Sequence, residues 1–333
     1  MTPTSEKHPL IVVSAAPHAR SEAAIQDIML DVLIALSPAA VMGAYFFGWR
    51  AALIIGLSVA SCVFFEALFQ KITKRKITVY DLSATVTGVL LAFCLPPTAP
   101  PWLPIVGAFV AIVIVKQLFG GLGQNFMNPA LAARAFLLAA YPVQMTDWVH
   151  RPHGLDAVTA ATPLAALREA AGANAVPTVI MYRDALIGYI GGCIGETCAA
   201  ALLLGGLYLL LRRVISWRIP VSFAAGLMAV IWIFGRDGLM TGFPVYEMLL
   251  GGALLGAIFM ATDYTTSPVT RTGQLIMGAG CGILTAIIRR FSGGYPEGVT
   301  YAILLLNLAV PLIDRVTRPR VFGRIAGKGA AGE

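Results

Sequence analysis

Long apolar runs alternate with short polar segments along most of the chain. A helix that crosses the hydrocarbon core of a bilayer needs about 20 apolar residues. Ten runs reach or approach that length, and they span residues 29–48, 51–69, 82–95, 102–119, 129–142, 185–211, 219–234, 245–261, 273–290 and 300–314. The pattern predicts an all-α polytopic membrane protein with about ten transmembrane segments.

Two of these runs, 82–95 and 129–142, are too short to cross a bilayer as regular helices. The first is followed directly by the sequence PPTAPP. Irregular backbone survives at membrane depth only where it is buried in protein. We therefore expect broken helices or re-entrant segments at both places.

The two halves of the chain resemble each other. Residues 88–91 read GVLL and residues 252–255 read GALL. Each stretch is followed by a proline and then by a Gly-Gly pair, 24 and 25 residues after that proline. Five spans separate the two stretches. Because an odd number of crossings reverses the direction of the chain in the membrane, the pattern predicts two inverted repeats. Coincidence in a chain with 34 glycines and 20 prolines stays open as the alternative.

Composition supports a membrane protein and excludes other classes. Apolar residues make up 58% of the chain, charged residues 12%, and the mean hydropathy is +0.78. The net charge of +7 comes from basic residues between apolar runs and in a tail, so no nucleic-acid partner is expected.

Metal chemistry is not expected. The five cysteines fall inside apolar runs without a CxxC pair, which argues against zinc and iron–sulfur sites. His150 and His153 have helical spacing, but Pro152 between them argues against a helix. We therefore expect no metal site in this chain.

The distribution of Lys and Arg predicts the orientation, because cytoplasmic loops retain positive charge. With both termini inside, sixteen of the 24 basic residues are cytoplasmic: Lys7, Arg20, Lys71, Lys74, Arg75, Lys76, Lys116, Arg212, Arg213, Arg218, Arg271, Arg315, Arg318, Arg320, Arg324 and Lys328. Seven lie outside: Arg50, Arg151, Arg168, Arg183, Arg236, Arg289 and Arg290. Arg134 is left within a span.

This orientation divides the chain into five parts. They are a cytoplasmic N-terminal tail (1–28), a first membrane repeat (29–142), an extracytoplasmic loop (143–183), a second membrane repeat (184–314) and a basic cytoplasmic tail (315–333). The one long loop is the first place to look for chemistry, because loops of this length usually carry function or are disordered.

Within that loop, Thr162 and Pro163 precede the helix-forming sequence LAALREAA, which Gly172 ends. This is the pattern of an N-cap, a proline at the first helical position and a glycine stop. Thr162 can simply cap a surface helix. The same hydroxyl is also where an attached phosphate would meet free backbone N–H groups.

The sequence DAVTAAT (156–162) resembles the D-x-x-[ST]-x-A-T signal by which FMN is joined to threonine in the RnfD family of Rnf electron transport complexes. The matching positions are Asp156, Thr159, Ala161 and Thr162, whereas Ala160 stands where related proteins often have Gly or Ser. The resemblance covers nearly the whole chain and includes APHAR (16–20), IMLDVLIALSPA (28–39), DLSATVTGVLLAF (81–93) and GGLGQNFMNPALAAR (120–134).

This resemblance implies a membrane subunit of an ion-motive ferredoxin:NAD oxidoreductase in the bacterial inner membrane. It implies FMN in phosphoester linkage to Thr162, attached by a flavin transferase, and also suggests a non-covalent riboflavin. The implied partners are the other Rnf subunits, A, B, C, E and G. The pattern is shared more distantly with the NqrB component of the sodium-pumping NADH:quinone reductase.

A second candidate region follows the fourth run. Its glycines, its Asn-Pro helix start and its intramembrane arginine could surround a flavin or form a helix break: Gly120, Gly121, Gly123, Asn125, Asn128 and Arg134. A purely structural re-entrant turn is the alternative. Arg134 needs a partner, either protein or cofactor.

Acidic residues in or beside spans are candidates for ion or proton movement: Asp31, Glu66, Asp81, Glu196, Glu247 and Asp263. Glu196, Glu247 and Asp263 form the predicted ion path, and Glu196 is the deepest of them in its run. Such residues also serve packing networks, and Asp81 lies close to Lys76 in sequence.

Two other functions fit the same sequence. A passive small-solute channel would use the repeats and broken helices and leave the loop without a role. A scaffold would use the loop to dock partner subunits without a cofactor.

Overall fold

Helices form almost all of the structure, a computed structural model that describes residues 24–150, 158–159, 164, 179–235, 238–291 and 298–318. Within these residues four helices are long and apolar enough to cross a membrane, judged by length and composition: α1 (Ile25–Phe47), α2 (Trp49–Ile72), α13 (Arg271–Phe291) and α14 (Val299–Val316). Shorter apolar helices accompany them: α3 (Ser83–Phe93), α4 (Trp102–Phe109) with the π-helix η2 (Val110–Gln117), α5 (Pro129–Ala140), α9 (Ala199–Leu211) and α10 (Arg218–Ile233). The all-α polytopic architecture is confirmed.

The remaining elements are short. They are η1 (Val79–Asp81), α6 (Pro142–Met145), β1 (Val149–His150), β2 (Val158–Thr159), α8 (Val179–Ile187), α11 (Pro244–Leu249), α12 (Ala253–Leu255) and the π-helix η3 (Gly256–Met260). β1 and β2 pair antiparallel, with Val149 opposite Thr159. α11, α12 and η3 together occupy the run predicted at 245–261, which the structure breaks at residues 250–252.

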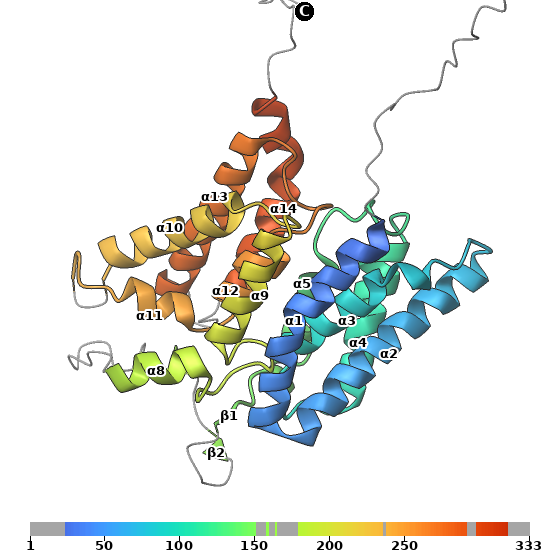
Figure 1. Cartoon of the computed structure of the whole chain (residues 1–333), viewed down its shortest axis with the longest axis horizontal. Coiled ribbons are helices and arrows are strands. Elements are labelled where there is room, and N and C mark those ends of the chain that lie inside the picture. The colour runs from blue at the N-terminus through green and yellow to red at the C-terminus, as the bar shows by residue number, and fades with distance from the viewer. Residues whose placement is uncertain are drawn as a thin grey trace, which may run out of the picture.

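The two halves of the chain lie side by side (Figure 1). Helices α1 to α5 form one half and helices α9 to α14 the other, and they meet where α1 packs against α9 and α5 against α14. The N-terminal end of α1 and the C-terminal end of α14 lie at one end of the molecule, while β1 and β2 lie at the opposite end. The inversion of the two repeats stays a prediction.

Both short runs form short helices, α3 and α5, as the sequence predicts. The prediction of one continuous segment over 185–211 is wrong, because residues 188–198 leave the helix between α8 and α9. The reason is that this backbone pairs with the end of α3: Ile194 N donates to Leu95 O at 3.1 Å and Gly195 N to Phe93 O at 3.1 Å.

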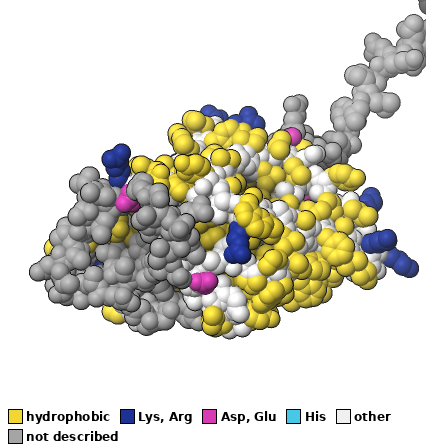
Figure 2. All heavy atoms as spheres, turned by 90° about the horizontal axis from the view of Figure 1, so that it is seen from below, with side chains coloured by type: hydrophobic (Ala, Val, Ile, Leu, Met, Phe, Trp, Pro, Cys, Tyr) yellow, Lys and Arg dark blue, Asp and Glu magenta, His cyan; other side chains and the backbone are white. Residues whose placement is uncertain are grey.

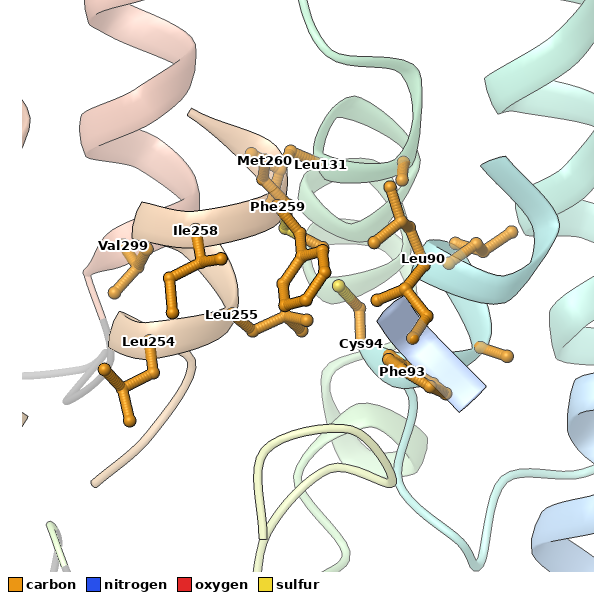
Figure 3. Close-up of a cluster of buried hydrophobic side chains, with 14 of the residues drawn as sticks. Leu90, Phe93, Cys94, Leu131, Leu254, Leu255, Ile258, Phe259, Met260 and Val299 are labelled. Atoms are coloured by element: carbon orange, nitrogen blue, oxygen red, sulfur yellow. The ribbon is translucent and has the colours of Figure 1, made fainter. Parts of the chain in front are cut away.

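Apolar side chains from both halves meet in the core between them. Figure 3 shows Leu255 and Phe259 pointing toward Leu90 and Cys94, whereas Leu254 and Ile258 lie on the side of Val299. All of these side chains are buried. The contact removes apolar surface from solvent and so stabilises the boundary between the halves.

Apolar side chains also cover the outside of the helices. Trp49 is 72% exposed and Phe64 is 59% exposed, on α2. Figure 2 shows hydrophobic side chains over much of the described surface at the end that carries β1 and β2, with few charged ones between them. The exposed apolar side chains along the sides of the helices fit lipid as the surrounding medium.

Candidate functional site

A cavity of about 100 Å³ lies where the two halves meet. Residues of α1, α3, η2, α9 and η3 line it, together with the segment before α5 and the segment after η3. Its polar lining residues are Ser83, Thr87, Lys116, Asn125, Asn128, Thr262, Asp263, Tyr264 and Thr265. The cavity thus brings together Asn125, Asn128 and Asp263, which the sequence placed in two separate candidate sets.

Asn128 begins α5, as the Asn-Pro sequence predicts. Its side-chain oxygen accepts from Ala130 N at 3.0 Å and from Leu131 N at 3.3 Å. Its side-chain nitrogen donates to Met260 O at 3.3 Å, at the end of η3. One buried amide therefore caps a helix of the first half and binds the second half.

The glycine-rich segment before α5 turns back toward the cavity. Gly120, Gly121 and Gly123 have φ values of +126°, +100° and +89°, which side chains of other residues rarely allow. Asn125 Nδ2 donates to Met127 O at 3.2 Å and to Thr265 Oγ1 at 2.9 Å. The positive φ values of the glycines therefore produce the break before α5, and the Asn125 amide bonds this segment to Thr265 of the other half.

Asp263 lies in the segment after η3. Its carboxylate accepts from Thr265 Oγ1 at 3.0 Å and from Thr266 Oγ1 at 3.3 Å. Desolvation raises the pKa of the Asp263 carboxyl, and hydrogen bonds from Thr265 and Thr266 oppose that rise in part. The group borders the cavity and is held by hydroxyls.

Arg134 and Glu196, which the sequence placed in different sets, form one buried ion pair. Arg134 NH1 lies 2.9 Å from Glu196 Oε1, and the side chains are 7% and 2% exposed. Arg134 NH2 also donates to Cys193 Sγ at 3.6 Å. Glu196 belongs to the break at 188–198 rather than to a helix, and the glycines of the sequence GGCIGE were the signal that could have indicated this break.

Glu247 has different partners, so the predicted ion path is divided among separate clusters. Arg290 NH2 lies 3.4 Å from Glu247 Oε1. Arg289 donates to Glu247 O and, at 3.0 Å, to Leu250 O, where it satisfies carbonyls at the break after α11. Both arginines lie in the last turn of α13, and their guanidinium groups point to protein partners, while their assignment to the outside of the membrane stays a prediction.

A third buried pair was not predicted from the sequence. Lys116 Nζ lies 2.8 Å from Glu66 Oε1, with side chains 2% and 1% exposed. Gln117 Nε2 donates to the same oxygen at 2.7 Å, and Lys116 Nζ donates to Ser83 Oγ at 2.6 Å. The assignment of Lys116 to the cytoplasmic side stays a prediction, and the structure adds that η2 extends through this residue and buries its side chain.

The other acidic candidates have protein partners nearer the ends of helices. Asp31 accepts from Tyr208 OH at 2.8 Å and pairs with Arg212 at 3.2 Å, so α1 is tied to the end of α9. Asp81 Oδ1 accepts from Ser83 Oγ at 2.6 Å. Asp81 thus bonds the start of α3 rather than the sequence neighbour Lys76.

The flavin motif lies largely outside the described residues, and Asp156, Ala161 and Thr162 are among those left out. Thr159 belongs to β2. Leu164, two residues after Thr162, is buried with Ala185, Tyr246 and Leu250.

Only one of the two histidines lies in the part of the chain that the structure describes. His150 belongs to β1, and His153 lies outside the described residues. Within the described ranges no group of three His, Cys, Asp or Glu side chains could hold a metal ion.

These features define a polytopic membrane protein with broken helices and buried charge pairs at the boundary of two helical halves. The sequence matches the NQR2, RnfD, RnfE family over residues 12–323, and the chain belongs to this family.

Named relatives cover nearly all of the chain. The D subunit of the Na(+)-translocating ferredoxin:NAD(+) oxidoreductase complex of Acetobacterium woodii is 50% identical over 313 residues, 94% of this chain and 95% of the relative. The D subunit of the proton-translocating ferredoxin:NAD(+) oxidoreductase complex of Clostridium ljungdahlii is 43% identical over 323 residues, 95% and 97% of the two chains. The D subunit of the ion-translocating oxidoreductase complex of Aliivibrio salmonicida is 38% identical, over 95% and 99%.

Proposed function

We propose that this chain serves an ion-translocating ferredoxin:NAD oxidoreductase complex as its D subunit and carries FMN as a phosphoester on Thr162. The observation that carries this proposal is the DAVTAAT sequence in a chain that belongs to the family and is 50% identical to a relative of this name. The bound FMN would supply electron transfer, and the chain would hold it within reach of the other Rnf subunits, A, B, C, E and G.

The described residues on either side of Thr162 support this role. Thr159 is paired in β2, and Leu164 is packed against Tyr246 and Ala185. The chain is therefore anchored on both sides of Thr162, three residues before it and two after it. An anchored attachment point suits a cofactor that must keep a fixed electron-transfer distance.

The proposed orientation has both termini in the cytoplasm and the flavin on the extracytoplasmic side. The ribbon of β1 and β2 lies at the end opposite the N-terminal end of α1 and the C-terminal end of α14 (Figure 1). The four basic residues between 71 and 76, at and just after the end of α2, are exposed. Positive charge retained at the end that carries the termini favours this end as the cytoplasmic one.

The proposal includes a second, non-covalent flavin, riboflavin, as the family resemblance implies.

The test is to express the chain with an extracytoplasmic flavin transferase and examine it on denaturing gels, where covalent flavin remains fluorescent. The parent band should fluoresce and Thr162→Ala should not. Thr146→Ala, in the same loop, is the matched control and should fluoresce like the parent.

A non-fluorescent parent band would favour the scaffold, and fluorescence that persists in Thr162→Ala would refute the site. Flux of small solutes through liposomes that contain the chain alone would favour the channel. The non-covalent riboflavin should be released by acid from the same preparations. We expect acid to release as much flavin from Thr162→Ala as from the parent.

A further inference from the structure

The buried pair of Lys116 and Glu66 belongs to a longer chain of hydrogen bonds that reaches the end of α3. Lys116 Nζ donates to Ser83 Oγ at 2.6 Å, and Ser83 Oγ donates to Asp81 Oδ1 at 2.6 Å. Asp81 is partly exposed, whereas Ser83 and Lys116 are buried and border the cavity between the halves. A continuous line of exchangeable protons thus joins the cavity to the surface.

We infer that Asp81, Ser83 and Lys116 form a proton relay, with Glu66 positioning Lys116, and that the ion moved along this half of the membrane path is H⁺. The inference rests on the proposed ion-motive function and goes beyond it by naming the ion and the groups that carry it.

The local backbone supports a role beyond packing. η2 is a π-helix of eight residues, and π-helices are rare and frequent at functional sites. Within it two consecutive residues, Lys116 and Gln117, both donate to Glu66 Oε1. The other carboxylate oxygen, Oε2, is buried and has no hydrogen-bond partner among the described residues. A pair that served only to close a buried contact would leave no such oxygen.

The chemistry of the ligands favours a proton over a metal cation. A hard metal cation needs several oxygen ligands. Here Glu66 Oε1 is occupied by two nitrogen donors, and the positive charge of Lys116 lies 2.8 Å away. A second cation would be repelled, whereas a proton can pass through lysine and hydroxyl groups.

The transfer balances within the groups named, with the proton entering from the cytoplasmic side. Protonated Asp81 gives its proton to Ser83 Oγ, while the Ser83 hydroxyl, turned toward Lys116, gives its own proton to the neutral Lys116 amine. Two O–H bonds break, and one O–H bond and one N–H bond form. The Lys116 ammonium then releases its proton into the cavity, and Asp81 takes a new proton from the cytoplasmic solvent. Glu66 stabilises the ammonium that forms.

The discriminating variant is Lys116→Arg. Arginine keeps the positive charge beside Glu66 but does not lose its proton in proteins, so it preserves the ion pair and blocks the relay. Ser83→Ala removes the hydroxyl, and Ser83→Thr restores it. Ser58→Ala is the matched control, because Ser58 is a buried serine of α2 that donates to Gly88 O outside the relay.

The assay uses the whole complex in inverted membrane vesicles without sodium. Ferredoxin-driven NAD reduction is measured with an uncoupler, and acidification of the vesicle interior is measured without it. In Lys116→Arg and Ser83→Ala the acidification rate per electron should fall by at least about tenfold. Electron transfer with the uncoupler should stay within about twofold of the parent in both. Ser83→Thr and Ser58→Ala should acidify like the parent.

Acidification by Lys116→Arg at the parent rate would overturn the relay, and so would a parent that transfers electrons without acidifying the sodium-free vesicles. A parent complex that transfers no electrons from ferredoxin to NAD would instead refute the proposed function. If Lys116→Arg is absent from the membrane, the contrast between Ser83→Ala and Ser83→Thr decides.

Discussion

Two buried ion pairs of similar geometry differ in the cation they contain. Lys116 and Glu66 lie 2.8 Å apart inside the first half, and Arg134 and Glu196 lie 2.9 Å apart between the halves. Both pairs are almost completely removed from solvent. The lysine pair continues through Ser83 to a partly exposed carboxylate, whereas the arginine contacts the Cys193 thiol within the core.

This difference separates two uses of buried charge. A lysine can give up a proton and become neutral, but an arginine remains charged at any accessible pH. The arginine pair is therefore suited to fixing the break at 188–198 against α5. The lysine pair is suited to exchange. Burial alone does not distinguish the two roles, and the chemistry of the cation does.

The largest expected effect is on stability, when each carboxylate is replaced by its amide. Glu196→Gln removes the negative charge beside a permanently charged Arg134 and should cost about 3–5 kcal/mol. Glu66→Gln should cost less, about 1–3 kcal/mol, because Lys116 can become neutral and still bond Ser83. Thermal unfolding of the purified chain in detergent measures both.

Replacing the arginine pair as a whole provides the control. Arg134→Met combined with Glu196→Gln removes both charges and should recover much of the loss caused by Glu196→Gln alone. Equal losses for Glu196→Gln and Glu66→Gln would contradict the distinction between the two pairs.

The sequence predicted the membrane class, the short helices α3 and α5 and the need of Arg134 for a partner, because these depend on local apolar length and on the cost of buried charge. It did not reveal that Glu196 is that partner, since 62 residues separate them and the contact depends on a break within an apolar run. It also did not reveal the pairing of Lys116 with Glu66, because this contact depends on how η2 packs against α2.

Asn128 joins the two halves through an uncharged hydrogen bond. It can therefore be compared with the ion pair of Arg134 and Glu196, which also lies between the halves. Asn128→Ala removes the N-cap of α5 and the bond to Met260 O and should cost about 1–2 kcal/mol in thermal unfolding. Asn128→Ser keeps a capping oxygen and should recover part of that loss. A loss as large as that of Glu196→Gln would mean that charge contributes little to the contact between the halves.

Asp263 is a third kind of buried acidic group, a carboxyl bonded to hydroxyls. Because its pKa is raised, mainly by desolvation, the folded state binds the proton more tightly than the unfolded state. The stability that the bound proton contributes is fully present below pH 3.8, the ordinary pKa of this carboxyl. It decreases as the pH rises from 3.8 through the raised pKa of the folded state. The asparagine of Asp263→Asn cannot ionise. The difference between the unfolding temperature of this variant and that of the parent should therefore increase across this pH range and then stay constant. Parallel curves for parent and variant would show that Asp263 ionises as easily in the folded chain as in water, and would place it with the solvated charges instead.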